Sequence, residues 1–152
     1  MPTPPTKDRD RQAPRDTGGQ ARDGDHPKTA PLALVFGASG YIGRHLAPHL
    51  VKAGYRVRAA ARRTAALRAE GWTDIDCVHA DALAPESLAA ALDGVRIVFY
   101  LVHSMASGAR FPERDRKAAR TFAAAAAEAG VERIVYLGGL APADPSSAHL
   151  TS

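Results

Sequence analysis

The chain has 152 residues, of which 45% are hydrophobic and 24% charged, and its formal net charge is +4. This length and composition fit one globular domain, and so modest and dispersed a charge does not point to a nucleic-acid partner. No run approaches the roughly 18 apolar residues of a membrane span, and the N-terminus lacks a signal-peptide core. The single cysteine, Cys77, excludes an intramolecular disulfide. Cys77 is expected to be a small buried hydrophobe, and a cytoplasmic location is the default.

Residues 1–30 differ in composition from the rest of the chain. They contain no Leu, Ile, Val, Phe, Trp or Tyr, and they interleave six Lys/Arg with five Asp. Such a segment cannot bury enough apolar area to offset the entropy of ordering it. We therefore expect a disordered tail over residues 1–30 and one folded domain over residues 31–152.

The folded part predicts strands and helices in strict alternation. Strands are expected over residues 32–37, 55–61, 75–79, 95–102 and 134–137, and helices over residues 41–53, 64–70, 85–92 and 112–129. Near-continuous apolar strands separated by helices are typical of a parallel sheet covered on both faces. The predicted fold class is α/β, a Rossmann-type doubly wound sheet of about five strands in the order 3-2-1-4-5. Ligands bind such sheets where the strand order reverses, here between strands one and four.

A glycine-spaced turn joins the first strand to the first helix. Gly37 ends the strand where a Cβ would obstruct the tight turn, Gly40 lets the backbone approach a pyrophosphate, and Gly43 lets the helix lie against the strand. The unpaired N–H groups at the helix N-terminus attract a phosphate. This context predicts a dinucleotide site, although a tight turn without a ligand is the alternative. The expected cofactor-binding residues of the turn are Gly37, Ser39, Gly40, Tyr41, Ile42 and Gly43.

The end of the second strand predicts which dinucleotide is preferred. In NAD-binding proteins of this type, an acidic residue at this place holds the ribose 2′-hydroxyl. Here the chain reads Ala61-Arg62-Arg63, with no carboxylate. A guanidinium fork suits the oxygens of a 2′-phosphate, so we expect NADP rather than NAD, with Arg62 the first contact and Arg63 the second. The alternative is that both arginines are ordinary solvated residues.

The ends of the third and fourth strands supply the other candidates. Asp81, followed by Ala82, is placed to accept a hydrogen bond from an adenine amino group, and a turn aspartate is the equally weighted alternative. Leu101 and Val102 come to the same edge of the sheet, near the expected nicotinamide ribose. His103 and Ser104 follow them, but adjacent residues of a strand point to opposite faces, so they do not form a catalytic dyad.

A metal site is not expected. His45 and His49 have the i, i+4 spacing of a helical metal pair, but the Glu of the metalloprotease motif is missing and Pro48 intervenes. The chain also lacks a GxSxG motif and a P-loop lysine, which argues against the common hydrolases and nucleoside triphosphatases.

Over residues 31–150 the chain resembles the extended or atypical short-chain dehydrogenase/reductases, most closely their NmrA-like, NAD(P)H-binding branch. The matching segments are residues 37–43, 57–62, 81–82, 99–105 and 133–139. The resemblance implies an NADP-binding domain in which the glycines and Arg62 hold the dinucleotide phosphates and Asp81 lies by the adenine.

The departures from that family concern catalysis. Its active reductases carry a Ser or Thr after the fifth strand and a Tyr-x-x-x-Lys pair further on. Here Gly138-Gly139 stands at the first position, and no tyrosine follows Tyr136. Without that pair carbonyl reduction lacks its usual proton donor, so no catalytic residue is assigned.

Three functional readings therefore stay open at this point. They are a nominal oxidoreductase, a non-catalytic module that senses the dinucleotide and regulates a partner, and a gene fragment without function. The chain is expected to be a truncated or partial homologue, or a stand-alone cofactor-binding half. We also expect self-association or marginal stability, because a fifth strand over residues 134–137 at the sheet edge exposes apolar side chains and backbone groups.

Overall fold

The computed structural model describes residues 29–102 and 111–138. The predicted tail therefore lies almost wholly outside the described residues. The elements, in chain order, are β1 (Leu32–Phe36), α1 (Tyr41–Lys52), β2 (Arg56–Ala61), α2 (Ala65–Arg68), β3 (Ile75–His79), α3 (Pro85–Leu92), β4 (Ile97–Tyr100), α4 (Phe111–Glu128) and β5 (Arg133–Tyr136). Their alternation is as predicted, with β4 shorter than expected at both ends and α2 reduced to a single turn.

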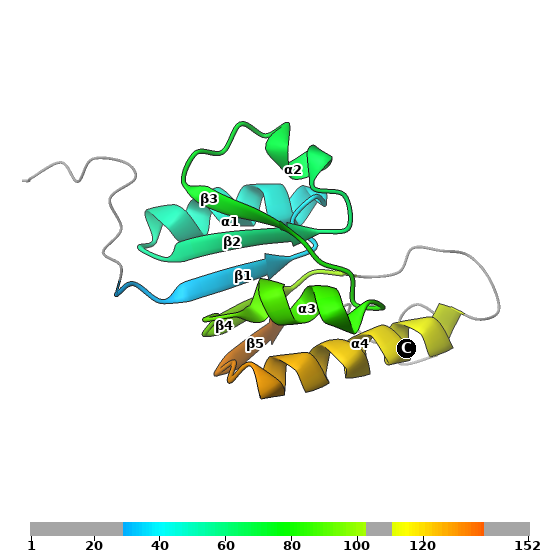
Figure 1. The fold of residues 1–152 in the computed structure, drawn as a ribbon. Coiled ribbons are helices and arrows are strands. Elements are labelled where there is room, and N and C mark those ends of the chain that lie inside the picture. Colours follow the sequence, from blue (N-terminus) through cyan, green and yellow to red (C-terminus); the bar gives the residue numbers. More distant parts are fainter. Residues whose placement is uncertain (1–28, 103–110, 139–152) are drawn as a thin grey trace, which may run out of the picture.

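The strands form one parallel sheet in the order β3-β2-β1-β4-β5 (Figure 1). This confirms the predicted fold class and strand order. The order reverses between β1 and β4, because the chain adds β2 and β3 on one side of β1 and then crosses to the other side. The carboxyl ends of β1 and β4 therefore border the crevice where such sheets bind ligands.

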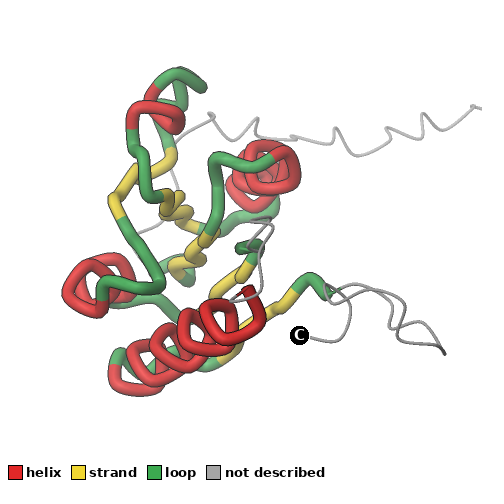
Figure 2. Tube along the Cα trace, turned by 90° about the vertical axis from the view of Figure 1, so that its right-hand side faces the viewer, coloured by secondary structure: helices red, strands yellow, loops and turns green. Residues whose placement is uncertain are grey.

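Helices cover both faces of the sheet, so that the strands lie in the middle of three layers (Figure 2). Every residue of β1 is buried, because its side chains alternate between two hydrophobic clusters. Ala33 and Val35 pack with α1 and α2, whereas Leu34 and Phe36 pack with α3 and α4. This double burial explains why the strand is apolar at every position instead of at alternate ones.

The helix ends follow ordinary sequence signals. Pro85 and Glu86 open α3, where proline needs no amide partner and a carboxylate faces the positive end of the helix. After the C-cap residue Ala53, helix α1 is followed by Gly54, whose φ of +91° suits glycine. Local sequence thus sets the lengths of both helices.

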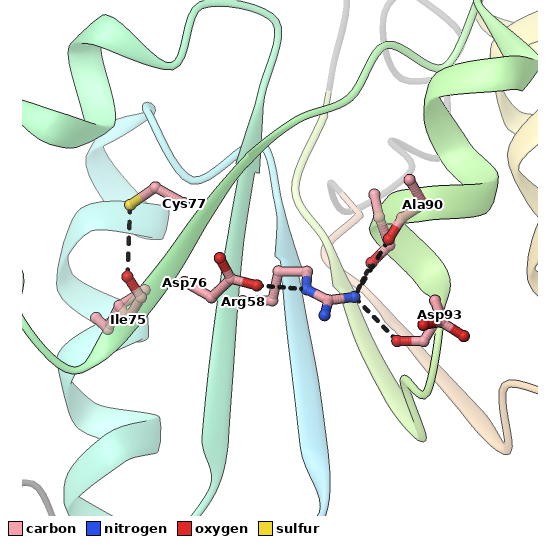
Figure 3. Close-up of polar contacts among 7 residues, drawn as sticks. Arg58, Ile75, Asp76, Cys77, Ala90 and Asp93 are labelled. Carbon is pink, nitrogen blue, oxygen red and sulfur yellow. Dashed lines mark hydrogen bonds and ion pairs between the residues drawn. The ribbon is translucent and has the colours of Figure 1, made fainter.

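Arg58, on a strand of the sheet, binds the C-terminal end of α3. The side chain of Arg58, on β2, is 15% exposed and forms an ion pair of 2.9 Å with Asp76 of β3. The same guanidinium donates from Nη1 to the carbonyls of Ala91 and Asp93, both at 2.9 Å, and more weakly to that of Ala90 (Figure 3). Since the last carbonyls of a helix lack helical partners, Arg58 satisfies them and holds α3 over β2.

The outer strand β5 is much less covered than β1. Ile134 and Val135 are 44% and 41% exposed, although their side chains point to opposite faces of the sheet. Within the described part of the chain, β5 pairs with β4 and ends the sheet. An apolar strand at this position is a surface that favours further pairing.

Candidate functional site

The glycine turn is tightly packed at two of its three glycines. Gly37 has a φ of +94°, and a Cβ there would lie 3.1 Å from Cγ2 of Val102. A Cβ on Gly43 would come within 2.5 Å of the Cα of Ala38 and 2.8 Å of the carbonyl oxygen of Gly37. The first turn of α1 therefore rests on backbone atoms of Gly37 and Ala38, directly after the last residue of β1.

Gly40 differs, because a Cβ there would meet only one neighbouring atom of the described residues within 4 Å. A Cβ there would meet the Gly37 carbonyl oxygen at 3.4 Å, an ordinary contact. Gly40 is the N-cap of α1 and has no side chain to accept from the first amides of the helix. The first helical hydrogen bond runs from the Arg44 amide to the Gly40 carbonyl, at 3.1 Å. The backbone N–H groups of Tyr41, Ile42 and Gly43 are therefore donors at the positive end of the helix.

This geometry fits a pyrophosphate. A glycine without a side chain before α1, three N–H donors and the helix dipole suit an anion of that shape. Tyr41 and Ile42, in the first turn of α1, are 80% and 48% exposed. Exposed apolar side chains beside an anion cradle suit the less polar parts of a nucleotide.

The loop is anchored to the end of β2. The amides of Gly37 and Ala38 both donate to the carbonyl of Ala60, each at 3.0 Å. Arg62 and Arg63 follow directly and both are exposed. The carbonyl of Arg62 accepts from Nδ1 of His79 at 3.0 Å, which ties this turn to β3. The structure thus places the two arginines beside the glycine loop.

The described structure also shows a basic residue at the loop that motif reasoning passed over. Nε of Arg44 donates to the carbonyl of Ser39 at 3.1 Å and lies 3.4 Å from Oε1 of Glu70. The sequence signal was its position directly after the third glycine. Its direction depends on how the loop folds back, which residue spacing does not reveal.

Asp81 adopts the turn arrangement. Its Oδ1 accepts from the amide of Leu83 at 3.0 Å, and its own amide donates to Oγ of Ser87 at 2.9 Å. Ala82 is buried in the cluster beneath α3 and α4. The carboxylate therefore shapes the loop before α3, at the carboxyl end of β3.

Leu101 and Val102 continue β4 to the same edge of the sheet. The amide of Leu101 donates to the carbonyl of Phe36 at 2.9 Å, and Val102 packs over Gly37. Both are partly buried. These contacts bring the end of β4 to the glycine loop, whereas His103 and Ser104 lie outside the described residues.

Tyr100, the last residue of β4, is 7% exposed and packs among aromatic rings. Its ring centroid is 5.4 Å from that of Phe36 and 4.9 Å from that of Phe122 on α4. Burial, together with the nearby charge of Asp115, raises the pKa of Tyr100 to about 12. The hydroxyl therefore keeps its proton at physiological pH.

The other titratable candidates serve local structure. Nδ1 of His45 donates to the Tyr41 carbonyl, and Nδ1 of His49 donates to the His45 carbonyl. Across residues 29–102 and 111–138, no three His, Cys, Asp or Glu side chains gather as metal ligands. Cys77 is half-buried and not fully buried as expected, and burial raises the pKa of its thiol.

Two further features concern the helices and the surface of the described residues. None of the helices in the described ranges is both long enough and apolar enough to cross a bilayer. A hollow bordered by Arg56, Arg58, Thr73 and Asp74 lies at the amino ends of β2 and β3. It is on the edge of the sheet opposite to the glycine loop, so it is separate from the candidate site.

The chain resembles known proteins over most of the folded region. Residues 37–151 match the family described as NAD(P)H-binding. The chain is 32% identical over 112 residues to cinnamoyl-CoA reductase 1 of Oryza sativa subsp. japonica, covering 69% of this chain and 33% of that protein. It thus spans about a third of the length of the curated relative it matches.

Two solved structures share the fold. One is a short-chain dehydrogenase/reductase superfamily protein from Agrobacterium tumefaciens with bound NAD, at 28% identity and a TM-score of 0.57, covering 70% of this chain and 32% of the other. The second is a nucleoside-diphosphate-sugar epimerase from Pseudomonas aeruginosa, at 25% identity and a TM-score of 0.59, covering 71% and 33%.

Proposed function

Since this chain belongs to the NAD(P)H-binding family, with short-chain dehydrogenase/reductases among its structural neighbours, we propose that its glycine turn holds the dinucleotide pyrophosphate. The observation that carries the proposal is the cradle before α1, where Gly40 carries no side chain beside three helical N–H donors. The neighbour from Agrobacterium tumefaciens contains NAD, which agrees with a nicotinamide dinucleotide as the ligand. The residues proposed for this contact are Gly37, Ser39, Gly40, Tyr41, Ile42 and Gly43.

The remaining contacts follow from the carboxyl edge of the sheet. Asp81 and Ala82 border the proposed adenine position, and Leu101 and Val102 border that of the nicotinamide ribose. Oδ1 of Asp81 already accepts from its own turn, which leaves Oδ2 for an adenine amino group. Residues 31–152 are proposed to form this one dinucleotide-binding domain.

The preferred dinucleotide is proposed to be NADP. Arg62 and Arg63 are exposed immediately after β2, where a carboxylate would favour NAD. The His79 side chain donates to the Arg62 carbonyl, which holds the backbone of this turn. Among residues 29–102 and 111–138 the Arg62 guanidinium has no hydrogen-bond or ion-pair partner. Charge-assisted hydrogen bonds of this kind contribute about 1.5–3 kcal/mol each.

The role proposed for this chain is that of the cofactor-binding part of an oxidoreductase. The dinucleotide supplies hydride chemistry when bound. None of the four tyrosines has a lysine four positions later, and Tyr100 holds its proton too tightly to relay it at neutral pH. The chain is therefore proposed to bind the cofactor without supplying the usual proton donor.

Calorimetric titration with NADPH and then NADH, at fixed salt, tests the cofactor assignment. We expect NADPH to bind more tightly, and Arg62→Ala to weaken NADPH about 10- to 100-fold while changing NADH less than about twofold. Arg56→Ala is the matched control, since Arg56 is an exposed arginine at the other end of the same strand. Equal losses for both nucleotides in the Arg62 variant would contradict the NADP preference, and no binding by the folded wild type would contradict the cradle.

We also propose that β5 pairs with β5 of a second copy. The strand ends the described sheet and leaves Ile134 and Val135 more than 40% exposed, which gives an apolar surface for this. A two-fold axis would bring identical edges together in antiparallel pairing.

A further inference from the structure

Arg44 is a cation at the glycine loop with unused hydrogen-bonding capacity. It follows Gly43 in the first turn of α1, and its side chain turns back to the loop. Its Nε donates to the Ser39 carbonyl at 3.1 Å and lies 3.4 Å from Oε1 of Glu70. Among the described residues, the two terminal nitrogens of this guanidinium have no hydrogen-bond partner. They therefore offer four N–H donors to a ligand.

The contacts of Arg44 link it to the residues that follow β2 in the chain. The loop that it touches is bonded through two amides to the Ala60 carbonyl, two residues before Arg62. Glu70 follows α2, the short helix that begins three residues after Arg62. Arg44 and Arg62 are thus linked through the same loop and the same strand end, Arg44 by its bond to Ser39 and Arg62 by following Ala60 in the chain.

We propose that Arg44 is a second specificity-determining residue for the 2′-phosphate of the dinucleotide, and that Glu70 lowers the affinity by competing for it. This inference rests on the proposed preference for NADP. A phosphate monoester carries about 1.5 to 2 negative charges at pH 7, more than one guanidinium neutralises. A planar guanidinium with both terminal nitrogens available suits the phosphate oxygens.

The charge of Glu70 determines how available the Arg44 guanidinium is to a ligand. The ion pair with Arg44 is exposed, with 49% of the arginine side chain and 27% of the glutamate side chain accessible. Exposed pairs of this kind are weak, so a dianionic phosphate displaces the carboxylate readily. Removing the negative charge of Glu70 leaves the Arg44 guanidinium available to the ligand.

A purely structural role for Arg44 makes a different prediction. If the side chain only braces the loop through the Ser39 carbonyl, its loss disturbs the pyrophosphate cradle for every adenine nucleotide. Specificity and bracing are therefore separated by ligands that differ in the 2′-phosphate alone.

The experiment is calorimetric titration of the full chain with adenosine 2′,5′-bisphosphate and with adenosine 5′-phosphate, in parallel with NADPH and NADH. For Arg44→Ala we expect about a tenfold loss for the bisphosphate and less than about a twofold change for the monophosphate. Glu70→Gln is expected to tighten the bisphosphate by about twofold to fivefold, and that gain should vanish when Arg44 is also alanine. Lys52→Ala, at the other end of α1, is the charge-matched control.

The outcomes separate this inference from the proposed function. Equal losses for the two adenosine ligands in Arg44→Ala, or a Glu70→Gln gain that persists without Arg44, overturn the inference while leaving NADP binding intact. A wild type that binds NADPH and NADH equally well overturns both the inference and the NADP preference. A folded wild type that binds none of the four ligands overturns the proposed function as a whole.

Discussion

Gly40 and Gly43 lie three positions apart, yet a methyl group at each would affect different properties. At Gly43 it would collide with backbone atoms of the loop, as close as 2.5 Å. At Gly40 the φ of −77° is open to any residue, and the nearest atom is at an ordinary distance. Stability therefore depends on Gly43, and access of a ligand to the cradle depends on Gly40.

We therefore predict that Gly43→Ala lowers the free energy of unfolding by about 1–3 kcal/mol or more, because the backbone must shift to accept the methyl group. Gly40→Ala should melt close to the wild type but bind NADPH about tenfold more weakly, because its methyl group enters the pyrophosphate space. Urea denaturation and calorimetry measure the two effects. A Gly40 variant that keeps full affinity would show that the ligand does not lie against this residue.

At the scale of single residues, the sequence predicted the glycines better than the charges. Their spacing after an apolar strand assigns each glycine a backbone role. The structure agrees for Gly37, and it shows that Gly43 lies against the backbone of Gly37 and Ala38. Arg44 was not predicted, since its contact with Ser39 depends on the path of the loop. Asp81 was left between two roles because a carboxylate suits a turn and a ligand equally well.

At the scale of elements, Arg58 links parts of the chain that local patterns treat separately. It lies more than thirty residues before the carbonyls of α3 that it satisfies. Hydrophobic periodicity and caps predicted every helix and strand, with errors at the ends of β4 and α2, because those signals are local. A contact from a strand to a distant helix end has no such signal.

We predict that Arg58→Met lowers the free energy of unfolding by about 2–3 kcal/mol, since it keeps the apolar stem but leaves several carbonyls and Asp76 without their donor. Asp76→Asn should cost less than about 1 kcal/mol, because the Asp76 side chain is 57% exposed. Urea denaturation gives both values, and amide exchange should speed up at the end of α3 in the Arg58 variant only. Equal costs for the two variants would show that the helix carbonyls gain little from Arg58.

At the scale of the whole molecule, strand order followed from connectivity alone. Right-handed crossovers and a glycine loop after the first strand leave few arrangements for five parallel strands, and the observed order is the predicted one. The relative exposure of the strands then explains where the molecule is vulnerable. β1 lies in the middle of the sheet and is fully buried, whereas β5 ends it and is exposed along its length.

We predict that the chain forms dimers or larger species at micromolar concentrations through β5, and that Ile134→Lys shifts it toward the monomer. A lysine on an edge strand opposes pairing by charge and by loss of apolar area. Light scattering coupled to gel filtration measures the mass, with Arg56→Lys on β2, three strands from β5, as a surface control. A wild type that stays monomeric over a concentration series would refute the pairing.

The backbone carbonyl of Ala60 is part of the loop structure, whereas the side chains of residues 62 and 63 can change without affecting it. Two loop amides depend on that backbone oxygen, whereas the side chains at positions 62 and 63 extend outward beyond it. Under the proposed function, exchanging those two side chains changes the preferred dinucleotide while the two hydrogen bonds to the Ala60 carbonyl stay in place. A protein with this fold can then alter its cofactor preference at positions 62 and 63 without rebuilding the backbone of the glycine loop.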